Sequence, residues 1–400
     1  MKELKLKQCD YLVGEVKEYK YCDFLTVSNA ERAVRFVKSY PEYQKTPLIN
    51  LQELAKKFNV KNILVKDESK RLGLNAFKGV GVLYGAVKVI CEKFSLDINN
   101  LSFKDLLVGE LNKKIKEMTF IAATDGNHGR GLAWVAQKLG CACHIYMPKN
   151  TTEARIRAIE SLGAKVIVTE GNYDETLKIV IEEAKRNNWE HIQDQAWEGY
   201  TKITNFISEG YTIIADEIRE QLLEYNIEKP THIFLQAGAG TFALGIMGYF
   251  ANLYRDKKPY MGILEPKNAA CYYNSIKNGK YTEIKGDLET IMAGLSVGEA
   301  NIVAWDILKT IVDGYGSCED SIAARGMRIL ANPLKGDTRI VSGESGAIGL
   351  GFVSMVCQLA EFEKLKEELK IDESSQILLI STEGDTDPEM YQSILWDMKY

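Results

Sequence analysis

The sequence is poor in the residues that build metal sites and in the segments that cross membranes. Its 400 residues include only four histidines, and none of its eight cysteines forms a C-x-x-C pair. We therefore expect no zinc site and reduced thiols. No apolar run reaches the ~18 residues that a transmembrane helix needs. The first residues alternate in charge and lack the apolar stretch of a secretory signal, which predicts a cytoplasmic protein.

The chain also lacks an excess of positive charge and two common nucleotide-binding signatures. Its formal net charge is −5, so neither a nucleic acid nor an anionic membrane is an expected partner. It contains no G-x-G-x-x-G dinucleotide loop and no Walker loop. Apolar residues make up 46% and charged residues 26%, which allows a full core. The length suits two packed domains.

Short apolar runs alternate with longer helical patterns, which predicts an α/β protein with open, mostly parallel sheets flanked by helices. The predicted strands are Ile63–Lys66, Thr119–Ala122, His144–Met147, Lys165–Val168, His232–Gln236, Met261–Leu264 and Ile377–Ser381. The predicted helices are Lys78–Phe94, His128–Leu139, Thr152–Leu162, Tyr173–Arg186, Phe206–Leu223, Phe242–Tyr254 and Gly346–Glu361. Gly140 and Gly163 stand where helix C-termini need positive φ.

The same pattern predicts two domains with a ligand cleft between them. Residues 78–210 form the predicted small domain, which carries Lys78 at its start and the Thr124–Gly129 loop. Residues 1–77 and 211–400 form the predicted large, discontinuous domain. Within the small domain, Phe94–Lys114 is interpreted as a weakly structured, charged surface connection.

Lys78 is the first candidate for chemistry. It follows Gly73-Leu74-Asn75-Ala76-Phe77 at a predicted strand-to-helix junction. A lysine in such a place is usually a solvated surface charge. Here small and apolar neighbours are expected to desolvate the amine in part, which favours Schiff-base formation.

The second candidate is Thr124-Asp125-Gly126-Asn127-His128-Gly129, a polar, glycine-containing helix start after a predicted strand. Backbone N–H groups at a helix start bind carboxylate or phosphate. Two interpretations of Asp125 stay open. It could simply cap the helix, or it could exchange a proton with a bound substrate.

Gln236-Ala237-Gly238-Ala239-Gly240-Thr241 is the third candidate, because a strand runs through two glycines into a helix. This arrangement is typical of a phosphate cradle, although it is also that of a tight strand-to-helix turn.

Two further segments are candidates. One ends a predicted buried strand, and the other mixes polar and aromatic residues. Ile380-Ser381-Thr382-Glu383-Gly384-Asp385 ends a strand in two hydroxyls, either of which could bond a heteroaromatic nitrogen. In His191–Tyr200, Asp194 is either structural or in contact with a cationic substrate group. Ser342–Ala347 is a further turn that could line a cofactor pocket.

Together these segments resemble the tryptophan-synthase-β-type (fold type II) pyridoxal-phosphate enzymes, and within them the diaminopropionate ammonia-lyases. The resemblance extends from about Tyr40 to Pro388 and includes Lys66–Arg71, Leu74–Lys78, Thr124–Gly129, Gln193–Tyr200 without Gln195, and Ser381–Pro388. The related threonine and serine dehydratases usually carry a serine at the positions of Asp125 and Ala76. Both departures favour the diamino-acid enzyme.

The resemblance implies a role for each of these residues. Lys78 would hold pyridoxal phosphate as a Schiff base in the interdomain cleft, with Phe77 behind the ring and Asn127 on its 3′-oxygen. The phosphate would be bound by Gly238, Ala239, Gly240 and Thr241. Ser381 would face the pyridine nitrogen, with Thr382 as its rival. Thr124, Asp125, Gly126, Asn127, His128 and Asp194 would contact the substrate.

The implied activity is that of a carbon–nitrogen lyase of amino-acid catabolism, which converts the L and D isomers of 2,3-diaminopropionate to pyruvate and two ammonia. The implied catalytic residues are Lys78, Asp125 and Asp194, and the implied assembly is a homodimer. The closest alternative is a threonine or serine dehydratase. A β-replacement synthase, a catalytically silent binding protein and a dinucleotide-dependent dehydrogenase are more distant alternatives.

Overall fold

The computed structural model describes residues 1–14, 16, 19–124, 126–149 and 151–400, with residue 174 described by its backbone alone. The chain divides into two compact units. The first unit consists of Met1–Asp23, Thr46–Lys70 and Glu217–Tyr400, and the second unit consists of Phe24–Lys45 and Arg71–Asp216. Each unit contains its own sheet.

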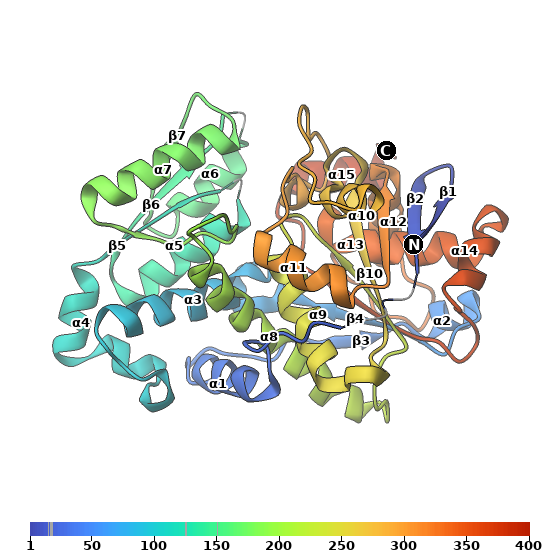
Figure 1. Ribbon diagram of the computed structural model, residues 1–400, viewed down its shortest axis with the longest axis horizontal. Helices are drawn as coiled ribbons and strands as arrows, with labels where there is room; N and C mark the ends of the chain where they lie inside the picture. Colours follow the sequence, from blue (N-terminus) through green and yellow to red (C-terminus); the bar gives the residue numbers. More distant parts are fainter. Residues whose placement is uncertain (15, 17–18, 125, 150) are drawn as a thin grey trace. The chain divides into compact units, whose positions relative to one another are not determined.

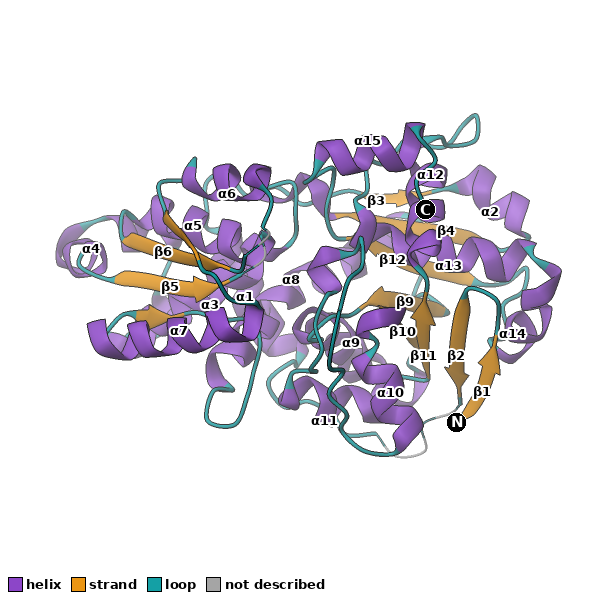
Figure 2. Ribbon diagram, turned by 90° about the horizontal axis from the view of Figure 1, so that it is seen from above, coloured by secondary structure: helices purple, strands orange, loops and turns teal. Residues whose placement is uncertain are grey.

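The sheet of the first unit has eight strands in the order β1-β2-β11-β10-β9-β12-β4-β3 (Figure 2). The inner strands β11, β10, β9, β12 and β4 are parallel, whereas β1, β2 and β3 join antiparallel at the two edges. Their bounds are β1 Lys2–Lys5, β2 Cys9–Val13, β3 Leu48–Asn50, β4 Asn62–Asp67, β9 His232–Gln236, β10 Tyr260–Pro266, β11 Gly314–Cys318 and β12 Gln376–Ser381. The prediction of mostly parallel sheets is confirmed.

The helices of the first unit bury the apolar faces of this sheet. They are α2 Gln52–Phe58, α9 Thr241–Tyr254, α10 Cys271–Asn278, α11 Ile302–Ile311, α12 Asp320–Ala331, α13 Glu344–Gln358, α14 Glu363–Glu368 and α15 Pro388–Trp396. α13 packs on β9 and β12, and α12 packs along α13. Because β9 and β12 are adjacent and parallel, the loops that follow them emerge at the same edge.

The second unit has a parallel four-stranded sheet in the order β7-β6-β5-β8. The strands are β5 Thr119–Ala123, β6 Ala142–Met147, β7 Lys165–Val168 and β8 Glu190–His191, and α5 and α7 pack against β5 and β6 (Figure 1). The helices are α1 Val27–Lys38, α3 Lys78–Lys93, α4 Gly109–Lys116, α5 Asn127–Leu139, α6 Glu153–Glu160 and α7 Tyr173–Asn187. α8, Lys202–Glu224, continues from this unit into the first.

The positive φ expected at Gly140 and Gly163 is present, and a local hydrogen-bond pattern marks the start of α7. Gly140 and Gly163 have φ of 77° and 85°. Asn172 caps α7 by accepting from the amide of Glu175, whose carboxylate bonds back to the amide of Asn172. This reciprocal pair satisfies two amides at the helix start.

Two segments differ from the sequence interpretation. Phe24–Lys45 groups with the second unit, where Tyr40 packs edge-on against Phe103 and Trp134. Residues 94–114 are not a weakly structured connection, because they include two short 3₁₀ turns and the start of α4. Phe103 and Leu106 in this segment are buried, and their apolar contacts hold it in place.

Three chemical features of the fold bear on function. All eight cysteines are thiols. Within the described ranges, no group of three or more His, Cys, Asp or Glu side chains is placed to hold a metal ion. Among the described residues, no single helix is long and apolar enough to cross a membrane. One bent pair of helices, Glu344–Gln358 with Ala360–Glu368, has the length and composition of a membrane span, by those two criteria only.

Candidate active site

Lys78 is the first residue of α3, and its amine is paired with a carboxylate. Its Nζ lies 2.7 Å from Oδ2 of Asp194, with side chains 16% and 17% exposed. The two residues are 116 positions apart in the chain. Lys78, Thr124, Gly126–Gly129 and Asp194 are called the lysine cluster below. Lys78 is therefore a partly buried amine with a charged partner, not a solvated surface lysine.

Close helix packing explains how Lys78 comes to lie in this cluster. A Cβ on Gly131 of α5 would lie 3.4 Å from the Cα of Gly79 in α3. A Cβ on Gly210 of α8 would lie only 2.8 Å from the Cα of Gly81. Glycines at these points let the backbones of the three helices approach closely. The start of α3, with Lys78, is fixed near the start of α5 as a result.

His128 is a second basic residue next to the Asp194 carboxylate. The residue is 1% exposed. Its Nε2 is 2.8 Å from the carbonyl oxygen of Ile192, and its Nδ1 is 3.5 Å from Oδ2 of Asp194. A carbonyl can only accept, so Nε2 carries a hydrogen. The hydrogen bond to Ile192 thus fixes the ring with Nδ1 next to the Asp194 carboxylate.

The charges around Asp194 keep it ionised. Burial raises the pKa of Asp194, but His128 and then Lys78 lower it by more, and the pKa falls to about 2. Nearby, burial is the main cause that lowers the pKa of His191 to about 4. Asp194 is therefore a carboxylate at neutral pH, in a place that already accommodates an ammonium group.

The Thr124–Gly129 loop is organised by a single hydroxyl. Thr124 is buried, and its Oγ1 accepts hydrogen bonds from the amides of Gly126 (3.0 Å) and Gly129 (3.1 Å). Asn127 is the first residue of α5 and is half-buried. Asp125, the predicted proton donor or acceptor, lies outside the described residues. The helix start predicted from the sequence is present.

Gln193 and Tyr200 support this cluster, and the sequence analysis assigned no role to either. The Gln193 side chain pairs with both backbone groups of Ala123, accepting from its amide at 3.1 Å and donating to its carbonyl at 2.9 Å. The Tyr200 hydroxyl accepts from the amide of Gln193 at 2.9 Å and donates to the carbonyl of His191 at 2.7 Å. These bonds join the end of β5 to the segment that carries Asp194.

The glycine loop lies in the first unit, at the carboxyl end of β9. Gly240 has φ of 95°, and α9 begins at Thr241. A Cβ on Gly240 would lie 2.0 Å from the hydroxyl oxygen of Tyr272, which donates to the carbonyl of Ala239 at 2.9 Å. Only glycine fits here, and the positive end of the α9 dipole favours an anion at the loop.

Asn301 also shapes this loop, without any local signal in the sequence that would have identified it. Its Nδ2 donates to Oγ1 of Thr241 at 3.0 Å, and its own amide donates to the carbonyl of Ala239 at 2.7 Å. Gly238 faces the 293–297 turn, where its Cβ would lie 3.1 Å from the Cα of Leu295. The loop is held on both sides.

Ser381 and Thr382 are buried at the end of β12 and have different hydrogen-bond partners. Ser381 donates to the hydroxyl of Ser342 at 2.8 Å. Oγ1 of Thr382 accepts from Nε2 of Gln236 at 2.8 Å. Gln236 therefore links the strand before the glycine loop to the strand that carries the two hydroxyls. We call Gly238–Thr241, Ser342–Ser345 and Ser381–Thr382 the glycine-loop cluster.

The donor set of the two clusters fits pyridoxal phosphate. The glycine loop suits a phosphate, and the lysine amine suits an aldehyde. Ser345 supplies a second indication, because its Oγ is buried without a hydrogen-bond partner in the part of the chain that the structure describes. A buried hydroxyl of this kind is costly unless something forms a hydrogen bond with it.

Phe77, the residue before the lysine, is 8% exposed. Its ring centroid lies 5.0 Å from that of Tyr211.

Comparisons with known proteins agree with this chemistry. Residues 40–383 match the family described as "Pyridoxal-phosphate dependent enzyme". Diaminopropionate ammonia-lyase of Escherichia coli (strain K12) is 47% identical over 375 residues, 93% of this chain and 92% of that protein.

Solved structures give the same result. A crystal structure of the selenomethionine-containing holo diaminopropionate ammonia-lyase from Escherichia coli has a TM-score of 0.92 and 43% identity, and covers 100% of this chain and 99% of that one. The same enzyme in complex with an aminoacrylate–PLP azomethine reaction intermediate has a TM-score of 0.91 and 43% identity, with 100% and 99% covered. The chain therefore belongs to the pyridoxal-phosphate-dependent enzyme family, and within it to the diaminopropionate ammonia-lyases.

Proposed function

We propose that this chain is a lyase that converts 2,3-diaminopropionate and water to pyruvate and two ammonia, and that it accepts both the L and the D isomer. The observation that carries the proposal is the Lys78–Asp194 pair, with 2.7 Å between Nζ and Oδ2. A carboxylate with a pKa of about 2 that already binds one ammonium group is suited to bind another. The β-substituent of diaminopropionate is an ammonium group.

Lys78 is assigned to the aldehyde of pyridoxal phosphate, and Gly238–Thr241 to its phosphate. When bound, the cofactor supplies an electron sink that makes the Cα proton of an amino acid acidic. Thr382 or Ser381 is assigned to the ring nitrogen. A neutral hydroxyl at that position leaves the nitrogen largely unprotonated, which suits elimination over side reactions.

Lys78, Asp125 and Asp194 have separate tasks in this proposal. As a free amine, Lys78 is the base for the Cα proton of the L isomer. Asp125 is the base for the D isomer, and Asp194 holds the β-nitrogen in its protonated form. Ammonia is a poor leaving group unless its nitrogen is protonated, so a carboxylate that stabilises the ammonium form assists its departure.

The alternative is a dehydratase of serine or threonine, whose leaving group is a hydroxyl. Such a substrate carries no second cation, so it offers Asp194 only the hydrogen bond of a neutral hydroxyl. The Asp194 carboxylate with its two basic neighbours, Lys78 and His128, therefore favours the diamino acid.

Pyruvate release tests the proposal. Purified protein saturated with pyridoxal phosphate is given D- and L-2,3-diaminopropionate, D- and L-serine, and L-threonine in turn. We expect fast release from both diaminopropionate isomers and little from the others. Pyruvate released from serine, or 2-oxobutyrate released from threonine, without turnover of diaminopropionate would contradict the proposal. It would show that the protein is a dehydratase.

Asp125→Asn separates the two proposed bases. The variant should lose about 10²–10⁴-fold in rate on the D isomer, the usual worth of a general base, with a much smaller loss on the L isomer. Equal losses on both isomers would contradict the two-base assignment. They would not contradict the proposed overall reaction.

We also propose a homodimer, by analogy with the family. Sedimentation equilibrium of the holoenzyme at several concentrations measures this directly. A mass near 90 kDa, about twice the 45.0 kDa of the chain, is the expected result, and a mass of one chain would contradict it.

A further inference from the structure

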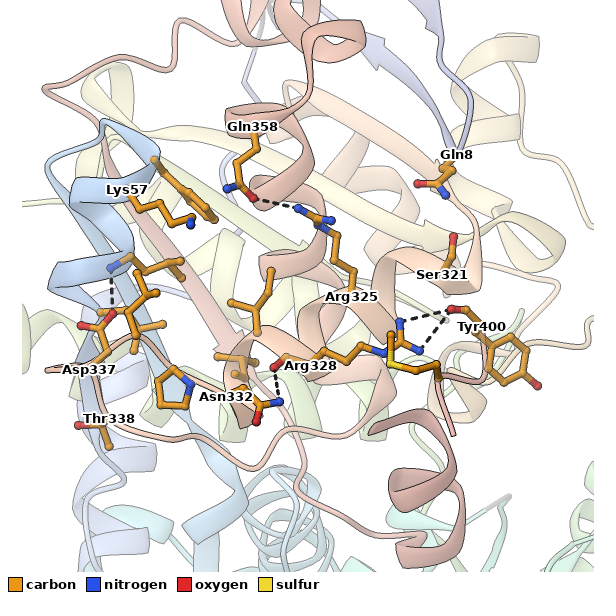
Figure 3. A pocket seen from close by; sticks show the side chains of 18 residues that line it. Gln8, Lys57, Ser321, Arg325, Arg328, Asn332, Asp337, Thr338, Gln358 and Tyr400 are labelled. Carbon is orange, nitrogen blue, oxygen red and sulfur yellow. Dashed lines mark hydrogen bonds between the residues drawn. The ribbon is translucent and has the colours of Figure 1, made fainter. Parts of the chain in front are cut away.

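A second cavity lies within the first unit and shares no residue with the glycine-loop cluster. It is lined by residues of α2, α12, the 332–338 loop, the end of α13 and the C-terminal residues (Figure 3). Its volume is about 580 Å³, within the range of sites that bind small molecules.

Three cations surround this cavity, and none of them forms an ion pair with an acidic side chain in the described part of the chain. They are Lys57 of α2 and Arg325 and Arg328 of α12. Asp337, the one acidic residue among the lining residues described, instead accepts from the amides of Glu53 and Leu54 at 2.9 and 2.8 Å. The cavity therefore carries net positive charge.

Hydrogen bonds hold the two arginines in place. Arg325 donates from Nε to the hydroxyl of Ser354 at 2.6 Å and from Nη2 to Oε1 of Gln358 at 2.9 Å. Arg328 donates from Nε to the carbonyl of Ile394 at 3.1 Å and from Nη2 to the carbonyl of Lys399 at 2.9 Å. Its Nη1 and Nη2 also lie 3.4 Å from an oxygen of Tyr400, the last residue. Figure 3 shows both arginines and Lys57 around one cavity. These bonds fix both guanidinium groups, and the two neutral acceptors of Arg325 leave its charge uncompensated, which lowers the cost of binding an anion.

The rest of the lining is largely apolar. Leu51, Leu54, Phe58 and Leu330 are buried side chains that contribute to it, and Leu334 is partly exposed beside them. An inorganic anion would leave this apolar surface unused. A ligand with an anionic head group and an apolar body would satisfy both parts of the lining.

We propose that this cavity binds a small organic anion, with a carboxylate or phosphate head group against Lys57, Arg325 and Arg328 and an apolar body against α2 and the 330–334 segment. The proposal is independent of the proposed reaction, because the two sets of residues do not overlap. An effector or a further metabolite of this chemistry would therefore bind while the cofactor is in place.

Fluorescence titration of the holoenzyme with 1-anilinonaphthalene-8-sulfonate tests the proposal, because this probe combines an apolar body with an anionic group. We expect saturable binding at one site, and weaker binding of the neutral analogue N-phenyl-1-naphthylamine. Displacement by phenyl phosphate or by phenylacetate then identifies the preferred head group. Binding that is not saturable, or that neither compound reverses, would overturn the proposal.

Lys57→Gln is the most informative variant. Lys57 is exposed, and no hydrogen bond or ion pair of its side chain is present among the described residues, so its replacement removes charge without removing a contact of the fold. We expect about 10-fold weaker probe binding, the usual effect of losing one charged hydrogen bond. Lys285→Gln, at a lysine whose side chain is 80% exposed and outside the cavity, is the matched control and should bind as the wild type does. Equal affinities of Lys57→Gln and Lys285→Gln would also overturn the proposal.

Discussion

At the scale of single residues, Asp194 is the group on which the proposed specificity depends. Its Oδ2 lies 2.7 Å from Nζ of Lys78 and 3.5 Å from Nδ1 of His128. A buried carboxylate is costly alone, and its two basic neighbours more than offset that cost. In the proposed reaction, the substrate ammonium takes the place next to Asp194 that the Lys78 amine has when no aldehyde is bound to it.

The Asp194 pKa has a consequence for the stability of the apoprotein, in which Lys78 is a free amine. Folding lowers the pKa from about 3.9 to about 2, so the stabilisation is present above pH ~4 and is lost as the pH falls towards ~2. Two pKa units correspond to roughly 2–3 kcal/mol. Asp194→Asn should lose about this much free energy of unfolding at pH 6, as measured by urea denaturation.

The difference between Asp194→Asn and the wild type should shrink below pH 4, because the wild-type carboxyl is then neutralised as well. Asp23→Asn, at an exposed acid, is the matched control and should change little. A destabilisation by Asp194→Asn that does not depend on pH would show that the charge of Asp194 is not its source.

Ser381 and Thr382 differ in what their hydroxyl hydrogens already do. Ser381 donates to Ser342, whereas Thr382 accepts from Gln236 and so keeps its hydrogen for another acceptor. An unprotonated pyridine nitrogen needs a donor. We therefore predict that Thr382→Val shifts the cofactor absorbance and lowers the elimination rate more than Ser381→Ala does. The opposite order would assign the ring nitrogen to Ser381.

At the scale of elements, the glycine loop shows how one backbone conformation limits the sequence. Gly240 needs its positive φ, and its missing Cβ makes room for Tyr272. Gly240→Ala should destabilise the protein by at least the ~1–2 kcal/mol of a left-handed residue and should also weaken pyridoxal phosphate binding. Urea denaturation and fluorescence titration with the cofactor measure the two effects.

Gly279 provides the control for that prediction. Its φ is 67°, and a Cβ there would meet nothing within 4 Å. Gly279→Ala should thus cost only the backbone strain and leave cofactor affinity unchanged. If both variants bind the cofactor as the wild type does, the loop is only a turn.

Elements with a strong local pattern could be predicted from the sequence, and those that depend on distant partners could not. β9 has the predicted bounds, His232–Gln236, because it is a continuous apolar run before a glycine loop. β11, Gly314–Cys318, was not predicted, since its sequence contains two glycines. Those glycines make room for the Tyr11 ring, since a Cβ on Gly314 would lie 2.4 Å from the Tyr11 hydroxyl.

The same distinction holds for the site. Lys78 and Gly238–Thr241 could be recognised because each stands at a junction between a strand and a helix. The pairing of Lys78 with Asp194 could not, because 116 residues separate them and only packing of the helices brings them together. The supporting roles of Gln193, Tyr272 and Asn301 likewise depend on tertiary contacts.

At the scale of the whole molecule, each unit contributes its own cluster of functional side chains. The first unit carries the glycine-loop cluster at the edge where β9 and β12 end, and the second unit carries the lysine cluster. The sequence predicted two domains but placed 24–45 in the larger one. No local pattern indicated that Tyr40 packs on Phe103 and Trp134. Length and composition predict how many domains to expect, whereas such contacts decide where a segment belongs.

Selection by Asp194 of a substrate with a β-ammonium group is tested by steady-state kinetics of one variant. kcat/KM is measured on L-2,3-diaminopropionate and L-serine for the wild-type holoenzyme and for Asp194→Asn. We predict a strong wild-type preference for diaminopropionate and a loss of about 10²-fold or more on that substrate in the variant, with a much smaller change on serine. A wild-type preference for serine, or equal losses on both substrates in Asp194→Asn, would contradict the account.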